Sequence, residues 1–125
     1  MARTKTLTGR AVSIDDFDCE PLHSIVGIGL CSQFMLMFDV HLSNGHTVRA
    51  FKHIVTRCYL HLDRTEPGLA YWYTDTGRYR PVDLTSALIA VFRDLWVHHL
   101  EDDPAETWRL LNIALDRLET PPVQQ

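Results

Sequence analysis

The sequence predicts an α+β protein in which an antiparallel β-sheet over residues ~6–82 precedes a C-terminal hairpin of two helices packed on the sheet. Three observations predict this class. Segments before Asp83 are rich in β-branched and aromatic residues. Turn sequences at Asn44-Gly45 and Gly77 divide these segments into hairpins. After Asp83 the apolar residues recur at helical spacing instead.

The first part of the sheet is predicted from alternating residues. TLTGRAVSI (residues 6–14) alternates well enough for a strand, and the polar residues 15–21 then form a loop. Residues 24–42 are expected to hold strand structure, in which Gly27 and Gly29 mark a bulge or a bend.

Asn44-Gly45, between FMLMFDVHL and HTVRAF, is the strongest local signal. Asn-Gly between two apolar runs is typical of a two-residue type I′ turn, in which both turn residues have positive φ. The numbers of facing residues then sum to 89, and Asp39 lies diagonal to Lys52 as a cross-strand ion pair.

Residues 50–62 fit two structures. Their apolar residues follow helical spacing, whereas their β-branched and aromatic content fits a strand. We favour the strand, because a meander then continues into a second hairpin made of LAYWYT, DTG and RYRPV, with Gly77 in the left-handed conformation. In that hairpin Tyr71 and Tyr73 share one face and Trp72 lies on the other.

Two helices are predicted after the second hairpin. Asp83 is expected to cap the first helix, and Asp103 the second, which has Pro104 at its first position and Glu106 in its first turn. The apolar stripe of the first helix is Leu84, Leu88, Val91, Phe92, Leu95, Trp96 and Leu100. The stripe of the second is Trp108, Leu111, Leu115 and Leu118, and Pro121-Pro122 end this helix.

Composition is that of a globular protein and weighs against two classes of function. The 125 residues are 46% apolar and 22% charged, and we expect one domain over residues 1–125 with flexible tails at 1–5 and 120–125. The net charge of −4 counts against a general nucleic-acid binder. The longest apolar stretch has 7 residues (25–31), far fewer than the roughly 20 that a membrane-spanning helix requires.

Three cysteines without a C-x-x-C pair and a start without a secretory signal predict free thiols in the cytoplasm.

Metal binding is the first chemistry that the histidine-rich stretch 40–61 suggests. The available ligands are His41, His46, His53, Cys58 and His61. The predicted hairpin disperses them, because His41 and His53 point to opposite faces. In HHLEDD (98–103), helix capping and the helix dipole account for nearly every residue. His98 and Asp102, four residues apart, could share a cation only on the weaker, metal-binding interpretation. We therefore expect no metal site, no cofactor and no catalytic residue; a small enzyme with Cys31 or Cys58 as nucleophile, or His98 in acid–base work, is an alternative.

Four residues in this stretch form the first candidate binding surface. Arg49, His53, Arg57 and His61 recur every four residues. They share one side of a helix, and as odd-numbered residues they also share one face of a strand. Such a row would bind an acidic partner, with a charge that grows as the pH falls towards about 6.5. A solvated polar face is the alternative interpretation.

The second hairpin supplies another candidate surface, formed by Trp72, Tyr73, Arg78 and Arg80. Trp, Tyr and Arg are the residue types most enriched in binding hot spots. Packing in the core is the alternative explanation for the aromatic residues.

These features predict a small non-enzymatic protein that binds a macromolecular partner, of the adaptor, chaperone or phage- or plasmid-encoded inhibitor type found in bacteria and phages. The expected partner is a protein with an acidic surface, and a homodimer through a strand edge or the helical hairpin is a further option. Nucleic-acid binding through the same residues is the alternative, which the negative net charge disfavours.

Overall fold

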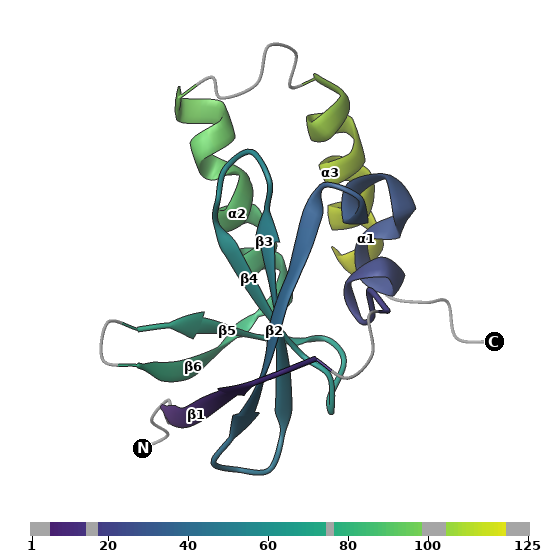
Figure 1. Cartoon of the computed structure of the whole chain (residues 1–125). Coiled ribbons are helices and arrows are strands. Elements are labelled where there is room, and N and C mark those ends of the chain that lie inside the picture. Colours follow the sequence, from purple (N-terminus) through teal and green to yellow (C-terminus); the bar gives the residue numbers. More distant parts are fainter. Residues whose placement is uncertain (1–5, 15–17, 75–76, 99–104, 120–125) are drawn as a thin grey trace, which may run out of the picture.

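The computed structural model describes residues 6–14, 18–74, 77–98 and 105–119, without the side chains of residues 94–98 and 119. Within these ranges the chain forms six strands and three helices (Figure 1). The strands are β1 (Leu7–Val12), β2 (Phe34–Leu42), β3 (Thr47–His53), β4 (Tyr59–Asp63), β5 (Leu69–Tyr73) and β6 (Arg78–Asp83). The helices are α1 (Leu22–Cys31), α2 (Leu84–His98) and α3 (Ala105–Glu119). The tails predicted at 1–5 and 120–125 lie outside the described residues.

The six strands form a closed antiparallel barrel in the order of the chain. β1 closes it, because Gly9 to Val12 pair with β2 while Leu7 and Thr8 pair with β6. Closure pairs the backbone groups of both edges, which an open sheet would leave to solvent. The α+β class with an antiparallel sheet is therefore confirmed, but the expected simple sheet is a barrel and the expected helical hairpin has a third helix beside it.

The β2–β3 hairpin is confirmed, but its predicted turn type is wrong. Its loop has three residues (43–45): the N–H of Leu42 bonds the carbonyl of His46 at 2.9 Å, and only Gly45 has positive φ (+92°) among the described loop residues. The numbers of residues paired near the turn sum to 88, so Asp39 faces Arg49. Lys52 faces Met35 instead, and the predicted Asp39–Lys52 ion pair is corrected.

Helix α1 occupies part of the segment for which a strand was expected. Leu22, Val26 and Leu30 are buried at four-residue spacing, as on one side of a helix. Gly27 interrupts the helix with φ 83° and ψ 166°, a conformation that is essentially confined to glycine. The two glycines therefore mark a broken helix, because burial of one apolar side against the core outweighs their low helix propensity.

Residues 50–62 form a tight hairpin, where the sequence favoured one continuous strand. β3 ends at His53, a turn occupies residues 54–58, and β4 starts at Tyr59. The N–H of Arg57 bonds the carbonyl of His53 at 2.9 Å, and Arg57 has φ 65°. The second predicted hairpin is confirmed in β5 and β6, with Gly77 at φ 76°.

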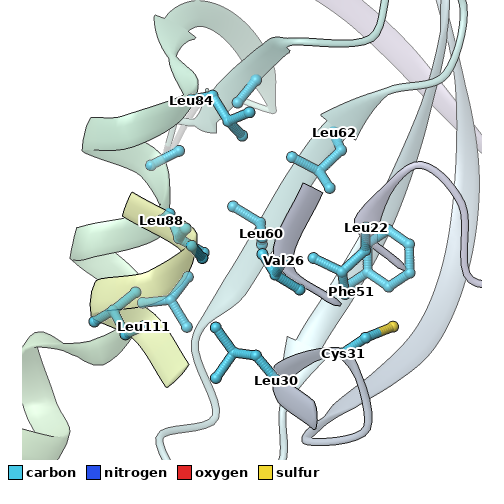
Figure 2. Close-up of a cluster of buried hydrophobic side chains, with 14 of the residues drawn as sticks. Leu22, Val26, Leu30, Cys31, Phe51, Leu60, Leu62, Leu84, Leu88 and Leu111 are labelled. Atoms are coloured by element: carbon cyan, nitrogen blue, oxygen red, sulfur yellow. The ribbon is translucent and has the colours of Figure 1, made fainter. Parts of the chain in front are cut away.

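The helices cover part of the outer face of the barrel and enclose the larger core. α2 packs against β4, β5 and β6, whereas α3 packs mainly on α1 (Figure 1). Figure 2 shows side chains of all three helices meeting those of β3 and β4, including Leu30, Leu60, Leu88 and Leu111. A second, smaller cluster lies inside the barrel and contains Val40, Leu42, Val48, Tyr71 and Tyr79.

The predicted start of α2 is confirmed. Oδ2 of Asp83 accepts the N–H of Ser86 at 2.9 Å, as expected of a helix cap. α3 carries Glu106 in its first turn, while the predicted Asp103-Pro104 start and Pro121-Pro122 end lie outside the described residues. No helix in the described ranges is long and apolar enough to cross a bilayer.

Candidate binding site

The predicted row of Arg49, His53, Arg57 and His61 does not form a surface. Arg49, His53 and His61 are buried, and only Arg57 is exposed. The turn at 54–58 places Arg49 and His61 on neighbouring strands, where His61 pairs with Ala50 and Arg49 with Leu62. Paired residues share a face, so Arg49 and His61 lie on opposite faces of the sheet.

Arg49 belongs to a buried ion-pair network. Its Nε and Nη2 donate to the two carboxylate oxygens of Asp39 at 2.7 and 3.0 Å, and its Nη1 donates to the carbonyl of Asp18 at 2.9 Å. Arg64 donates to Asp39 at 3.1 Å. Arg49 is therefore a structural residue that ties the 18–20 loop to β2 and β3.

His53 has a structural role in the β3–β4 turn. Its Nδ1 accepts the N–H of Thr56 at 3.1 Å, so its Nε2 carries the proton and donates to Oε1 of Gln33 at 2.8 Å. Burial against Phe34 and Phe92 lowers the pKa of His53 to about 4. The ring is neutral at pH 7 and both of its nitrogens have partners.

The aromatic hairpin β5–β6 divides its candidate residues between two faces, as predicted from the alternation. Trp72 packs towards the outer core, while Tyr73 lies on the interior face and is 57% exposed. Arg78 and Arg80 are exposed on β6. The structure thus separates Trp72 from Tyr73 and leaves the two arginines in solvent.

Tyr73 belongs to an aromatic pocket in the barrel interior. The cavity has a volume of about 530 Å³, within the range typical of ligand sites. Gly9 and Ala11 of β1 form one wall of the cavity. The aromatic residues that line the pocket are Phe38, Tyr59, His61, Tyr71, Trp72, Tyr73 and Tyr79, so the predicted residues Trp72 and Tyr73 both contribute to it.

The imidazole of His61 lies at the centre of these rings. It stacks on Tyr59 with 5.8 Å between centroids and an angle of 12°, and it meets Tyr79 edge-on at 5.4 Å. His61 is 7% exposed, and burial lowers its pKa to about 4. Its Nδ1 is, within the described part of the chain, the buried side-chain polar atom that has no hydrogen-bond partner.

Lys52 marks the rim of the pocket beside Tyr59. Its Nζ lies 5.5 Å from the centroid of the Tyr59 ring, and the two residues are paired across β3 and β4. This arrangement is a cation–π contact that fixes a positive charge at the rim.

Asp63 closes the interior face of β4 two residues beyond His61. Its Oδ2 accepts the hydroxyl of Tyr71 at 2.6 Å and Nδ1 of His46 at 2.8 Å. Its Oδ1 accepts the backbone N–H groups of Thr65 and Glu66, each at 2.7 Å. The hydrogen bond from Asp63 raises the pKa of His46. Both carboxylate oxygens of Asp63 are thus occupied by hydrogen bonds within the fold.

Metal and thiol chemistry find little support in the described residues. The residues with known placement contain no group of three His, Cys, Asp or Glu side chains that could hold a metal ion. Burial raises the pKa of the Cys31 thiol to about 12. The side chain of His98 and the whole of Asp102 lie outside the described residues.

No family model, curated protein or solved structure matches this chain.

The pocket was not predicted, although the sequence carries a signal for it. Tyr or His stands at every second position in YLH (59–61) and YWY (71–73), and Tyr79 faces Tyr73 across the hairpin. This alternation places the rings on one face of three adjoining strands. That the face is concave follows only from barrel closure.

Proposed function

We propose that the protein is a non-enzymatic binding protein that recognises a partner protein through the aromatic pocket. The observation that carries the proposal is a cavity of about 530 Å³ lined by aromatic rings, whose rim residues Tyr59 and Tyr73 are 40% and 57% exposed. Exposed aromatic side chains around a preformed apolar cavity are typical of binding hot spots.

Charge at the rim supports a partner with acidic groups around the inserted side chain. Lys52 lies against Tyr59 and supplies this charge, whereas Arg78 is exposed on the face of β6 opposite to Tyr79. This proposal keeps the acidic partner expected from the sequence but moves its binding surface, because three residues of the Arg/His row are buried.

A non-enzymatic role agrees with the state of the cysteines. A thiol whose pKa is raised to about 12, as in Cys31, is protonated at neutral pH and is a weak nucleophile. Cys58 donates its S–H to the carbonyl of Thr56 at 3.7 Å. The three free cysteines fit a reducing compartment, and we place the protein in the cytoplasm.

The test is to purify the protein with its partner from the native host, identify that partner, and titrate the two purified proteins by calorimetry. We expect the double variant Tyr59→Ala/Tyr73→Ala to bind at least roughly 30-fold more weakly, because two rim rings are lost. The matched control is Ile28→Ala/Ile54→Ala, which removes two exposed apolar side chains that do not line the pocket. Equal affinity of wild type and the tyrosine variant would contradict the proposal.

Nucleic-acid binding is the second candidate, favoured by Lys52 beside the stacked rings of Tyr59 and His61. Aromatic faces next to positive charge can stack the bases of a single strand. Fluorescence anisotropy with single-stranded oligonucleotides would then show binding that weakens steeply with salt. Absence of binding at low salt excludes this candidate.

A homodimer is a further proposal, now with a different route. Strand-edge pairing is disfavoured, because each described strand of the barrel has two neighbours. The helices, with Ile89 and Ile113 exposed, offer the remaining surface. Sedimentation velocity at two protein concentrations distinguishes a dimer from a monomer.

A further inference from the structure

The buried nitrogen of His61 points to the chemistry of the group that enters the aromatic pocket. This inference rests on the proposed function. We propose that the pocket accepts the indole ring of a tryptophan side chain from the partner protein, and that the indole N–H donates a hydrogen bond to His61.

The first argument is the state of the imidazole. A neutral imidazole has one donor and one acceptor nitrogen, and His61 is neutral at pH 7 because burial lowers its pKa to about 4. Nδ1 is the nitrogen enclosed without a partner in the described residues. A buried acceptor without a partner is less rare than a buried N–H without one, so the proton belongs on Nε2 and Nδ1 is the acceptor.

The second argument is the free energy that an occupant recovers. A buried polar atom without a partner costs about 1–3 kcal/mol, which a donor brought into the pocket offsets. Tyr59 stacks on one face of the imidazole and is 40% exposed, so its ring offers an entering indole an apolar face to pack against. An indole N–H is a donor that itself requires a partner when buried.

The third argument excludes a cation. Aromatic cages bind methylated ammonium groups through ring faces. Here the ammonium of Lys52 already lies 5.5 Å from the Tyr59 centroid and would repel a second positive charge. The occupant is therefore not a cation, and a cavity of about 530 Å³ has room for a bicyclic ring.

The experiment titrates the protein with two probes that differ only at the ring nitrogen, 3-methylindole and 1,3-dimethylindole, followed by NMR chemical shifts. We expect the wild type to bind 3-methylindole roughly tenfold more tightly, the value of one buried hydrogen bond. His61→Phe keeps an aromatic ring but removes the acceptor, and we expect it to bind both probes equally. Ile28→Ala, on the exposed surface of α1, keeps the tenfold preference.

A second measurement uses the wild type alone, in case His61→Phe does not fold. We expect 3-methylindole, and not 1,3-dimethylindole, to shift the ¹⁵N resonance of His61 Nδ1. Equal binding of the two probes to the wild type would overturn the inference. So would tighter binding of 4-methylphenol, adenosine or tetramethylammonium, which would indicate a tyrosine, a nucleobase or a cation.

These outcomes are separable from failure of the proposed function. If Tyr59→Ala/Tyr73→Ala binds the partner as well as wild type does, the proposed function is wrong. If that variant loses the partner while the wild type does not distinguish the two indoles, only the tryptophan inference is wrong.

Discussion

Asp39, Arg49 and Arg64 hold opposite charges together beneath the 18–20 loop. Arg49 is fully buried and Asp39 nearly so, and the two share a bidentate ion pair with atoms 2.7 and 3.0 Å apart. Burial of both charges is costly, but once they are buried the removal of one leaves the other without compensation. The network therefore matters most when a single member is changed.

We expect Arg49→Ala to lower the free energy of unfolding by about 3–5 kcal/mol, because the carboxylate of Asp39 then loses its buried partner. Arg57→Ala, an exposed change only eight positions away, should stay within about 0.5 kcal/mol of wild type. Urea denaturation of the two variants measures both values. Similar stabilities would show that Arg49 is not paired as described.

Stability should also depend on pH through His53 and His61. Burial lowers the pKa of each to about 4, below the ordinary value of 6.5, so the unfolded chain binds more protons between these values. The stabilising contribution is therefore present above pH 6.5 and is lost as the pH falls towards 4. The raised pKa of His46 acts in the opposite sense, but its side chain is half-buried and more strongly screened.

The measurement is the urea midpoint at pH 7.5, 6.0 and 5.0. We expect the midpoint to fall with pH, and to fall less in His61→Phe, which has no imidazole to protonate at this position. A midpoint that rises towards pH 5.0 would mean that His53 and His61 are not buried as neutral rings.

The sequence singled out Arg49, His53 and His61 as members of an exposed binding row, but the structure buries all three. Arg49, His53 and His61 are special positions, but spacing alone could not tell a binding row from buried partners. The sum of paired residue numbers is 88 at Asp39–Arg49, one less than predicted, and that shift turns Arg49 from a surface charge into the partner of Asp39. The β3–β4 turn then moves His61 to the interior face.

Among the elements, α1 depends most on one residue. Gly27 has φ 83° and ψ 166°, where an L side chain is strained, although a Cβ there would find space. The break lets the two halves of α1 place Leu22 and Leu30 in the same core. Glycine is therefore required by the backbone and not by packing.

We expect Gly27→Ala to destabilise the protein by about 1–3 kcal/mol through backbone strain. The neighbouring Ile28→Ala, at a position 76% exposed, is the matched control and should change little. Thermal unfolding followed by circular dichroism compares them. A neutral effect of Gly27→Ala would indicate that the helix continues without a break.

Elements with a local chemical signal could be predicted from the sequence. Asp83 caps α2, and Gly77 supplies the left-handed position of the second hairpin, as its neighbours indicated. The β2–β3 loop could not be settled in this way, because Asn-Gly fits both a two-residue and a three-residue loop. α1 was missed because its glycines and short apolar run resemble a bent strand. Its contact with α3, and the core that it shares with the barrel strands, select a helix.

For the whole molecule, barrel closure depends on close approach at Gly9. A Cβ built at Gly9 would lie 2.5 Å from Cγ1 of Val40 and 3.1 Å from Cε2 of Tyr79, both inside the barrel. Closure itself could not be predicted, because an open meander and a closed barrel have the same local sequence. They differ only in whether β1 reaches β6, about 70 residues later in the chain.

We expect Gly9→Ala to cost about 1–3 kcal/mol, because a methyl group at this position overpacks the interior. Thr8→Ala, exposed on the same strand, is the control and should have a much smaller effect. Differential scanning calorimetry gives the two transition temperatures. If Gly9→Ala is as stable as Thr8→Ala, the interior is less tightly closed than described.

The seam between β1 and β6 has a consequence for kinetics. It consists of two residue pairs, Leu7 with Tyr79 and Thr8 with Arg78, whereas β1 pairs with β2 over four. Separating the two pairs swings β1 aside on β2 and opens the pocket along its length, next to Gly9 and Tyr79. An occupant in contact with Tyr79 would hold β1 against β6. We therefore expect the backbone amides of the β1–β6 residue pairs to exchange hydrogen more slowly in the complex. For the proposed occupant, we expect contacts with the ring faces to set the affinity, and separation of β1 from β6 to set the rates of binding and dissociation.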